Sequence, residues 1–197
     1  MRLFSTIARL SLRLAGWRIV GEAPDAPRYV LIAAPHTSNH DFPLMMLFAI
    51  SLGIWPAWVG KHTLFKPPLG WLMRLLGGIP VDRRAPGGMV EQLAQRFAQQ
   101  ERLVLVMPPE GSRGKRQHWK SGFYHVARSA GVPIATSYLD YTRKQGGIGP
   151  LLVPSEDLRA DMDALRAFYA DKQGRHPERQ GPIRLAAEDE GEDEAAD

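Results

Sequence analysis

Short apolar runs rich in β-branched residues alternate with stretches of helical periodicity along most of the chain. The apolar runs predict buried strands at 29–34, 55–60, 79–81, 103–107 and 133–139. The helical patterns predict helices at 44–52, 67–76, 88–100 and 122–130, followed by a last helix that starts at Ser155. Strands that alternate with helices favour the α/β class, here one domain with a mostly parallel central sheet flanked by helices.

The segment from 42 to 60 carries no charged residue, so its composition resembles that of a membrane span. Pro43 and Pro56 bracket its middle, however, and Gly53 interrupts it. Because these residues break helices, the segment divides into one helix and one strand. We therefore expect its helix to be buried in the core or partly sunk in lipid, without crossing a bilayer.

The N-terminus predicts a basic amphipathic helix, which we assign to residues 1–20. Its apolar stripe consists of Leu3, Ile7, Leu10 and Leu14. Its arginines lie away from that stripe or at its edges, at Arg2, Arg9 and Arg13. Such a helix can lie in a membrane interface with its arginines toward anionic headgroups, or it can pack on its own domain. It lacks the roughly 20 apolar residues that a transmembrane helix needs.

The net charge of +4 conceals an acidic C-terminus. Residues 188–197 hold seven of the 21 acidic residues and no basic one, which leaves 25 basic against 14 acidic residues elsewhere, a balance of +11. We therefore divide the chain into the helix of 1–20, a domain of 21–187 and a solvated, disordered tail of 188–197. The basic body predicts an anionic partner, such as a phospholipid headgroup, a phosphorylated small molecule or nucleic acid.

The chain has no cysteine, which excludes disulfides, thiolate metal sites and a cysteine nucleophile. Nothing at its start resembles a secretory signal, since arginines break the apolar stretches. We expect a cytoplasmic protein that lies on the inner face of the cell membrane.

His36 and Asp41 lie five residues apart in a polar loop that follows the first apolar run. A carboxylate that accepts from one ring nitrogen fixes the tautomer, so the other nitrogen becomes a general base. Such a base can activate a substrate hydroxyl directly, without a serine nucleophile. Alone, this spacing also fits a surface histidine beside a helix-capping aspartate.

A second polar loop, 108–120, follows the predicted strand at 103–107. Its glycines permit a tight backbone, and its arginine lies between them, in the run Pro109-Glu110-Gly111-Ser112-Arg113-Gly114. Such a loop can present N–H groups and a guanidinium to a phosphate, or it can be an ordinary turn with a solvated arginine. A third segment, 78–84, ends its strand in Arg83 and Arg84.

Taken together in this order, these segments resemble the four sequence blocks of the glycerolipid and lysophospholipid acyltransferases, the superfamily that contains the 1-acyl-glycerol-3-phosphate acyltransferases. The matching runs are His36-x4-Asp41, Gly78-Ile79-Pro80-Val81-Asp82-Arg83, Pro109-Glu110-Gly111-Ser112-Arg113 and Val132-Pro133-Ile134. The resemblance covers residues 29–141. It departs from the family pattern at Pro35, where the family usually has Asn, and does not identify the acceptor.

The resemblance implies an O-acyltransferase that moves a fatty acyl group from acyl-CoA or acyl carrier protein to the hydroxyl of a lysophospholipid-like acceptor. It makes His36 the general base and Asp41 its orienting partner. The acceptor headgroup site would comprise Arg83, Glu110, Gly111, Ser112 and Arg113. The acyl-binding region would contain Val132, Pro133 and Ile134. The thioester is a co-substrate, so we expect no cofactor.

Three alternatives deserve weight beside this interpretation. A non-enzymatic module that binds anionic lipid fits the basic body, whereas nucleic acid does not fit, because the tryptophans lie in apolar runs rather than among Lys and Arg. A serine hydrolase is disfavoured because no Gly-x-Ser-x-Gly sequence occurs. A metal site at His36, His40 and Asp41 is disfavoured by the family resemblance.

Overall fold

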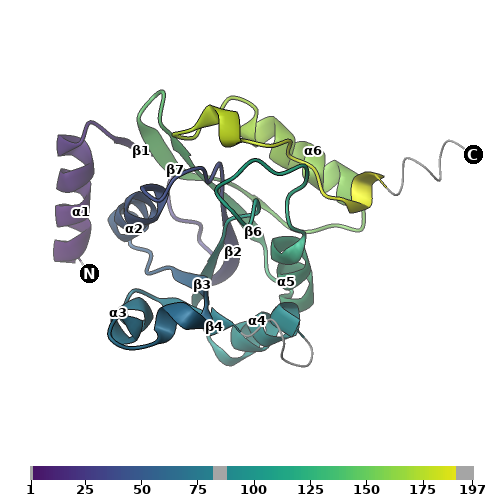
Figure 1. Ribbon diagram of the computed structural model, residues 1–197, viewed down its shortest axis with the longest axis horizontal. Helices are drawn as coiled ribbons and strands as arrows, with labels where there is room; N and C mark the ends of the chain where they lie inside the picture. The colour runs from purple at the N-terminus through teal and green to yellow at the C-terminus, as the bar shows by residue number, and fades with distance from the viewer. Residues whose placement is uncertain (1, 82–87, 190–197) are drawn as a thin grey trace, which may run out of the picture.

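Seven strands form one sheet in the computed structural model, which describes residues 2–81 and 88–189 (Figure 1). The strands lie in the order β1-β7-β6-β2-β5-β3-β4, and neighbours are parallel except for β6 and β7. Their bounds are Arg18–Val20 (β1), Arg28–Ala33 (β2), Ala57–Lys61 (β3), Gly78–Val81 (β4), Leu103–Met107 (β5), Ile134–Asp140 (β6) and Gln145–Leu152 (β7). The predicted single α/β domain with a mostly parallel sheet is confirmed.

Helices cover both faces of the sheet (Figure 1). Their bounds are Arg2–Leu14 (α1), Asp41–Ser51 (α2), Gly70–Leu75 (α3), Gly88–Gln99 (α4), Gly122–Ala130 (α5) and Leu158–Tyr169 (α6), with 3-10 turns at His62–Phe65 (η1) and Pro177–Arg179 (η2). Strand β2 shows how the faces differ. Its Tyr29 and Leu31 pack toward α2, while Val30 and Ile32 join the core beneath α4, α5 and α6. Burial on both faces explains why β2 is a continuous apolar run.

The predicted elements agree with the structure from β2 to β6. The differences concern the extent of two helices and two strands that the pattern does not predict. The predicted helix at 67–76 is shorter in the structure, where α3 covers only Gly70–Leu75 and residues 67–69 form a turn. The last helix starts at Leu158 because the Asp157 carboxylate caps it by accepting from the Ala160 N–H at 3.0 Å. The pattern also does not predict β1 or β7. Strand β1 has only three residues, and β7 carries three glycines and a proline, which are poor strand formers. A Cβ on Gly147 would collide with the Val20 carbonyl, so glycine lets the two strands pair.

The N-terminal helix packs on α2 by a narrow edge and leaves its predicted apolar stripe exposed. Ala8 and Leu12 are buried, and Ser5 and Arg9 both donate to the carbonyl of Ser51, at 2.9 and 3.0 Å. The exposed apolar side chains of α1 are Leu3, Phe4, Ile7, Leu10 and Leu14. One edge of α1 therefore packs on its own domain, and the stripe that could lie in a membrane interface stays exposed. The helix ends at Leu14, and the assignment of residues 1–20 to it is wrong because 18–20 form β1.

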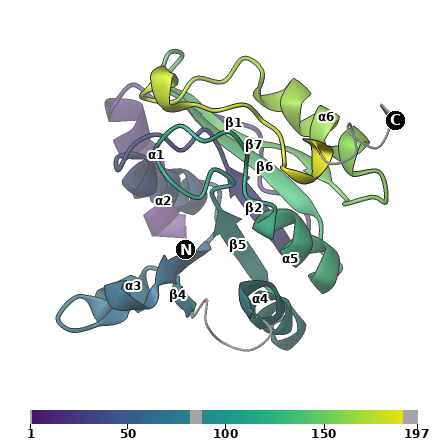
Figure 2. The same cartoon turned by 45° about the vertical axis from the view of Figure 1, so that its right-hand side comes forward.

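The C-terminal segment after α6, yellow in Figure 2, returns across the molecule beside the loop that follows β5. Trp119 and Leu185 form a β-bridge there. Glu188 is buried and binds the guanidinium of Arg166 at 2.8 Å, and Asp189 pairs with His118 at 2.7 Å. Residues 188 and 189 thus belong to the folded body, and the predicted tail boundary at 188 is wrong. Residues 190–197 lie outside the described residues.

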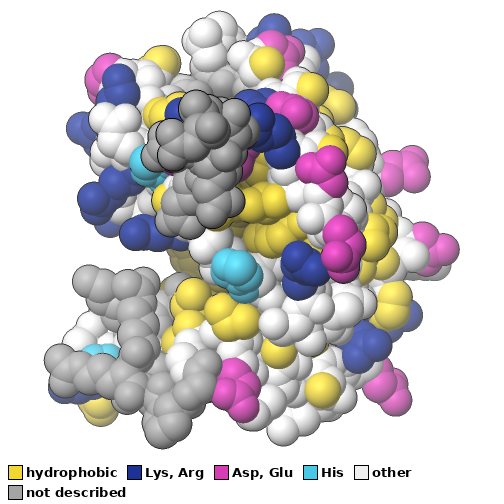
Figure 3. All heavy atoms as spheres, turned by 90° about the vertical axis from the view of Figure 1, so that its right-hand side faces the viewer, with side chains coloured by type: hydrophobic (Ala, Val, Ile, Leu, Met, Phe, Trp, Pro, Cys, Tyr) yellow, Lys and Arg dark blue, Asp and Glu magenta, His cyan; other side chains and the backbone are white. Residues whose placement is uncertain are grey.

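Two observations concern the surface. Within the described residues, no helix has the length and apolar composition needed to cross a bilayer. On the visible part of the face that α4, α5 and α6 form, acidic and basic side chains are interspersed (Figure 3). This face does not present a field of one sign, so the basic balance of the chain is not concentrated there.

Candidate active site

The loops that follow β2 and β5 meet at one edge of the sheet. Both strands are parallel and adjacent, with Ile32 opposite Met107, so their carboxyl ends lie together. Functional loops of such sheets lie at this edge. The first loop carries His36 and runs into α2, and the second begins at Pro108.

His36 and Asp41 form the predicted pair. The ring Nδ1 of His36 lies 3.1 Å from Oδ2 of Asp41, and both side chains are largely buried. With Nδ1–H donating to the carboxylate, Nε2 is left unprotonated and available as a base. Asp41 is the first residue of α2, so the start of the helix fixes the carboxylate relative to the loop.

The Asp41 carboxylate is satisfied on both oxygens. Its Oδ2 accepts from the backbone N–H groups of Thr37 and Ser38, each at 2.9 Å, and its Oδ1 accepts from the Tyr141 hydroxyl at 2.7 Å. Burial opposes ionisation, but hydrogen bonds from His36, Tyr141 and Ser38 outweigh it and hold the pKa of Asp41 below its ordinary value. The residue is therefore an anion at neutral pH and can stabilise a charged His36 ring.

Glu110 lies beneath the histidine loop. Its Oε1 accepts from the backbone N–H of His36 at 2.9 Å, and its buried Oε2 has no hydrogen-bond partner among the described residues. Burial raises the pKa of Glu110, although the bond from His36 opposes the shift. Glu110 is not among the residues that line the cavity described below. Glu110 is therefore placed to hold the His36 loop and is not placed to contact a headgroup in the cavity.

Gly111, Ser112 and Arg113 line the cavity, as a substrate-binding loop must. Gly111 has a φ of 64°, and a Cβ there would approach the side chain of Lys120 to 3.0 Å, so glycine suits the turn. The hydroxyl of Ser112 accepts from Arg116 at 3.0 Å, which steadies the loop. Arg113 is exposed and forms no ion pair or hydrogen bond with the rest of the described chain. Its guanidinium is free to bind an anion.

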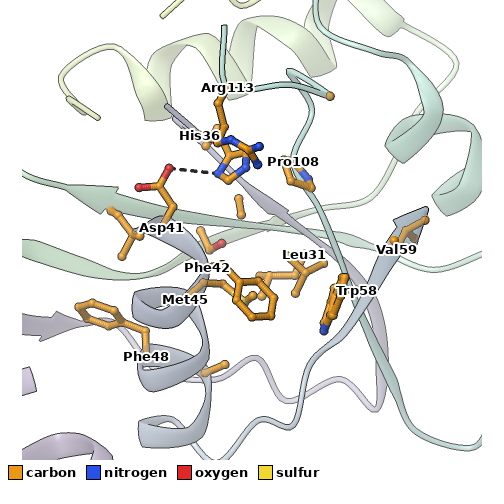
Figure 4. A pocket seen from close by; sticks show the side chains of 18 of the residues that line it. Leu31, His36, Asp41, Phe42, Met45, Phe48, Trp58, Val59, Pro108 and Arg113 are labelled. Atoms are coloured by element: carbon orange, nitrogen blue, oxygen red, sulfur yellow. Dashed lines mark ion pairs between the residues drawn. The ribbon is translucent and has the colours of Figure 1, made fainter. Parts of the chain in front are cut away.

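A cavity of about 1030 Å³ opens at the dyad and extends between α2 and the sheet. Most of its lining is apolar and comes from β2, α2 and β3, with Leu31, Phe42, Met45, Phe48, Trp58 and Val59 among its residues. Figure 4 shows these side chains on one side of His36 and Arg113 on the other. The candidate base thus lies between a cationic end and an apolar end.

One predicted site element, the segment Val132–Ile134, is not brought to this cavity. Val132, Pro133 and Ile134 lie at the amino end of β6, where the Pro133 carbonyl accepts from the Val30 N–H at 3.0 Å. Val132 and Ile134 are part of the core beneath α5, and the cavity opens at the other end of the strands. Arg83 lies outside the described residues.

Sequence reasoning missed the C-terminal contributors. Tyr141 follows β6, and Thr37 of the histidine loop accepts from the His176 N–H at its hydroxyl (3.1 Å) and from Arg179 at its carbonyl (3.5 Å). These residues come from segments with no motif of their own. The only signal in the sequence for any of them is Tyr141, a polar aromatic residue just after the predicted strand at 133–139.

Among the described residues, no group of three or more His, Asp or Glu side chains is arranged to hold a metal ion. His40, which the sequence places near the dyad, instead has its Nδ1 3.2 Å from the hydroxyl of Ser38.

A model of a known protein family matches more than half of the chain. The family model described as Acyltransferase matches residues 19–140. The chain belongs to the acyltransferase family. The matched region contains the dyad, the Glu110–Arg113 loop and the cavity helix α2, and it ends just before Tyr141.

Two curated relatives of the chain are named as 1-acyl-sn-glycerol-3-phosphate acyltransferases. A 1-acyl-sn-glycerol-3-phosphate acyltransferase of Streptococcus pneumoniae is 28% identical over 141 residues, which cover 68% of this chain and 53% of that one. A chloroplastic 1-acyl-sn-glycerol-3-phosphate acyltransferase of Brassica napus is 30% identical over 114 residues, or 55% of this chain and 33% of that one. The chain thus spans between a third and about half of the length of these relatives.

A solved structure shares the fold. The 1-acyl-sn-glycerophosphate (LPA) acyltransferase PlsC of Thermotoga maritima matches with a TM-score of 0.58 at 17% sequence identity, covering 86% of this chain and 75% of that chain. At this identity the similarity concerns the architecture of the acyltransferase domain and not its substrates.

Proposed function

We propose that the protein is an O-acyltransferase that moves a fatty acyl group from a thioester to the hydroxyl of a lysophospholipid-like acceptor. The observation that carries the proposal is the position of the His36–Asp41 pair between Arg113 and the apolar cavity. Transfer to a phosphate-bearing acceptor needs these two environments, an anion site on one side of the reacting oxygen and an apolar space for the transferred acyl chain on the other. The names of the relatives support the same class of reaction.

The chemistry follows from the geometry of the pair. Nε2 of His36 takes the proton from the acceptor hydroxyl, while Asp41 stabilises the imidazolium through Nδ1–H. The acceptor oxygen attacks the thioester carbonyl, a C–O bond forms, and the C–S bond breaks when the tetrahedral intermediate collapses. The imidazolium returns its proton to the leaving thiolate, so the free thiol departs and the base is regenerated. No residue of the chain is acylated.

Arg113 supplies the positive charge for the acceptor's phosphate, assisted by the loop of Gly111 and Ser112. Arg83 joins this headgroup site in the proposal, on the strength of the family resemblance. The acyl chain lies in the cavity between α2 and the sheet, which makes the Val132–Ile134 region a part of the core and not of the acyl site. The donor is acyl-CoA or acyl carrier protein.

The protein works, in this proposal, on an anionic membrane surface at the inner face of the cell membrane. The exposed stripe of α1 is one contact, with Arg13 in its last turn. A second exposed apolar group on η1 and α3 consists of Leu64, Leu69, Trp71 and Leu75. Leu64 also lines the cavity, so this group adjoins its opening. A lipid acceptor then enters from the bilayer without passing through water.

The alternative, a module that binds anionic lipid without catalysis, accounts for the apolar surface and for Arg113. It gives no reason for a buried carboxylate held by four hydrogen-bond donors against a histidine in the cavity wall. The dyad therefore favours the enzyme.

The test is incubation of the intact protein with labelled acyl-CoA or acyl carrier protein and a panel of lyso-acceptors, with the products identified by mass spectrometry. The acceptors differ in headgroup, with and without phosphate. An acylated product that requires His36 supports the proposal. Vesicle binding without any acylated product, across the panel and both donors, would favour the non-enzymatic alternative.

A further inference from the structure

Tyr141 reaches the catalytic pair from a distant part of the chain. Its hydroxyl donates to Oδ1 of Asp41 at 2.7 Å, across 100 residues of sequence. Tyr141 directly follows β6, and β6 pairs with β2, whose carboxyl end leads to His36. The strand order therefore places this hydroxyl next to the carboxylate that orients the base.

The two oxygens of Asp41 have unequal support. Oδ2 accepts from Nδ1–H of His36 and from the backbone N–H groups of Thr37 and Ser38. Within the described residues, Oδ1 accepts only from the Tyr141 hydroxyl. Asp41 is buried, with 4% of its surface exposed, so water does not readily replace a lost donor. A buried acceptor without a partner carries its full desolvation penalty. The Tyr141 hydroxyl therefore helps to keep the carboxylate ionised and in this orientation.

Tyr141 is itself held in place. Its backbone N–H donates to the Gln173 carbonyl at 2.9 Å, and its ring meets that of Trp17 edge to face, with centroids 5.0 Å apart. These supports come from the C-terminal segment and from the residue that precedes β1. Tyr141 is not among the residues that line the cavity, so its hydroxyl has no access to a substrate there.

We propose that Tyr141 is a positioning residue that fixes the Asp41 carboxylate, and through it the His36 ring, for the general-base step. This inference rests on the proposed function. The charged groups that face the Tyr141–Asp41 bond are His36, Glu110 and Arg175. Burial and then the bond to Asp41 raise the pKa of Tyr141, while Arg175 opposes the shift. The hydroxyl thus remains a donor over the pH range in which histidine titrates.

The structure provides a matched control at Tyr124. Tyr124 is on α5, and its hydroxyl donates to the buried carboxylate of Asp161 on α6 at 2.8 Å. Neither residue lines the cavity. Tyr141→Phe and Tyr124→Phe each remove one tyrosine–aspartate hydrogen bond and keep the ring. They separate a role in catalysis from a loss of stability, which thermal melting measures in both.

The kinetic test compares the two variants with the acceptor and donor that the mass-spectrometric panel identifies. We expect Tyr141→Phe to lower kcat by about tenfold, the value of a hydrogen bond to a charged group, with both KM values unchanged. Without the Tyr141 donor, the Asp41 carboxylate becomes more basic and favours the imidazolium, so the acid limb of kcat/KM moves to higher pH. Tyr124→Phe keeps kcat and the pH profile. Wild-type kcat in Tyr141→Phe, an equal loss in both variants, or a change in KM alone would overturn the inference.

A second test needs no substrate and so separates the two proposals. The Nδ1–H proton resonance of His36, identified by its absence in His36→Ala, moves in Tyr141→Phe and not in Tyr124→Phe. If it moves but no acyl transfer is found, the proposed function fails and the positioning role stands. If acyl transfer occurs but the resonance and kcat do not respond, the positioning role fails alone.

If Tyr141→Phe does not fold, replacing Tyr141 alone with 3-fluorotyrosine provides the same readout. Fluorination makes the hydroxyl a stronger donor and preserves the packing of the ring. The Asp41 carboxylate then attracts the Nδ1–H proton less, and the His36 resonance moves in the direction of a weaker bond. An unmoved resonance would overturn the inference.

Discussion

Glu110 accepts a hydrogen bond from the backbone N–H of His36 at 2.9 Å and thereby ties the loop after β5 to the loop after β2. The family resemblance implies a role for Glu110 in the headgroup site, yet its carboxylate is buried beneath the His36 loop and does not line the cavity. Its neighbours Gly111, Ser112 and Arg113 line the cavity instead. In the run 110–113, the first residue therefore holds the His36 loop, and the other three line the cavity where an anion could bind.

His36→Ala is expected to reduce acyl transfer by ~10²–10⁴-fold, the usual contribution of a general base, without unfolding the protein. Asp41→Asn should be milder, because it removes the charge and keeps the shape of the orienting residue. Steady-state rates, with circular dichroism as the check on folding, measure both. A folded His36→Ala variant with near-native turnover would contradict the assignment of the base.

Glu110 predicts a specific pH dependence of stability. Since burial raises its pKa in the folded protein, its stabilising contribution is present below the ordinary glutamate pKa and is lost as the pH rises through the raised value. Glu110→Gln cannot ionise, and its amide oxygen still accepts from His36. The melting temperature of the wild type should therefore fall relative to that of Glu110→Gln as the pH rises from acid to neutral.

The activity of the same position provides an independent check. Glu110→Ala removes the acceptor of the His36 N–H, so it should lower kcat, while Glu110→Gln should retain most of it. The KM for the acceptor should change little in either variant. A rise in the acceptor KM in both, with kcat intact, would instead assign Glu110 to the headgroup site.

Arg113→Ala should raise the KM for a phosphate-bearing acceptor more than the KM for the donor, because the guanidinium faces the cavity without a protein partner in the described chain. A control is Arg128→Ala on α5, which removes an exposed arginine that pairs with Glu156 outside the cavity. We expect no change in either KM for the control. If only the donor KM rises in Arg113→Ala, the arginine binds the phosphates of the donor.

Ala49 on α2 is buried and lines the cavity, so a larger side chain there should shorten the space for an acyl chain. We expect Ala49→Leu to lower kcat/KM for long acyl donors more than for short ones. The ratio between a long and a short donor, measured in one preparation, cancels any general loss of folded enzyme. An unchanged ratio would show that the acyl chain does not reach Ala49.

The exposed stripe of α1 predicts binding to anionic vesicles that weakens at high salt. Leu14→Ser should weaken the binding, since Leu14 is 80% exposed and contributes no buried contact. Val153→Ser is the matched control, because Val153 is 76% exposed but lies outside α1 and α3. Cosedimentation with vesicles measures both. Equal binding by the two variants and the wild type would exclude this stripe as the contact.

The class of the fold and the two loops of the candidate site could both be predicted from the sequence. Apolar runs such as 103–107 match strands because burial on both faces of a parallel sheet requires continuous apolar residues. Parallel strands place their carboxyl ends on one edge, so the loops of His36 and Glu110 could be expected there together. The order of the four sequence blocks indicated the acyltransferase family, and the family model confirms this prediction.

The contacts between side chains of the site could not be predicted, because they depend on the order of the strands in the sheet. Strand β2 lies between β6 and β5, so its loop receives Tyr141 from one neighbour and Glu110 from the other. This strand order is a long-range property that no local periodicity encodes. It also places Val132–Ile134 at the end of β6 remote from the cavity. Packing likewise decides that α1 buries Ala8 and Leu12 while Leu3, Leu10 and Leu14 stay exposed. Local patterns fix which face of an element is apolar, but only packing decides what that face meets.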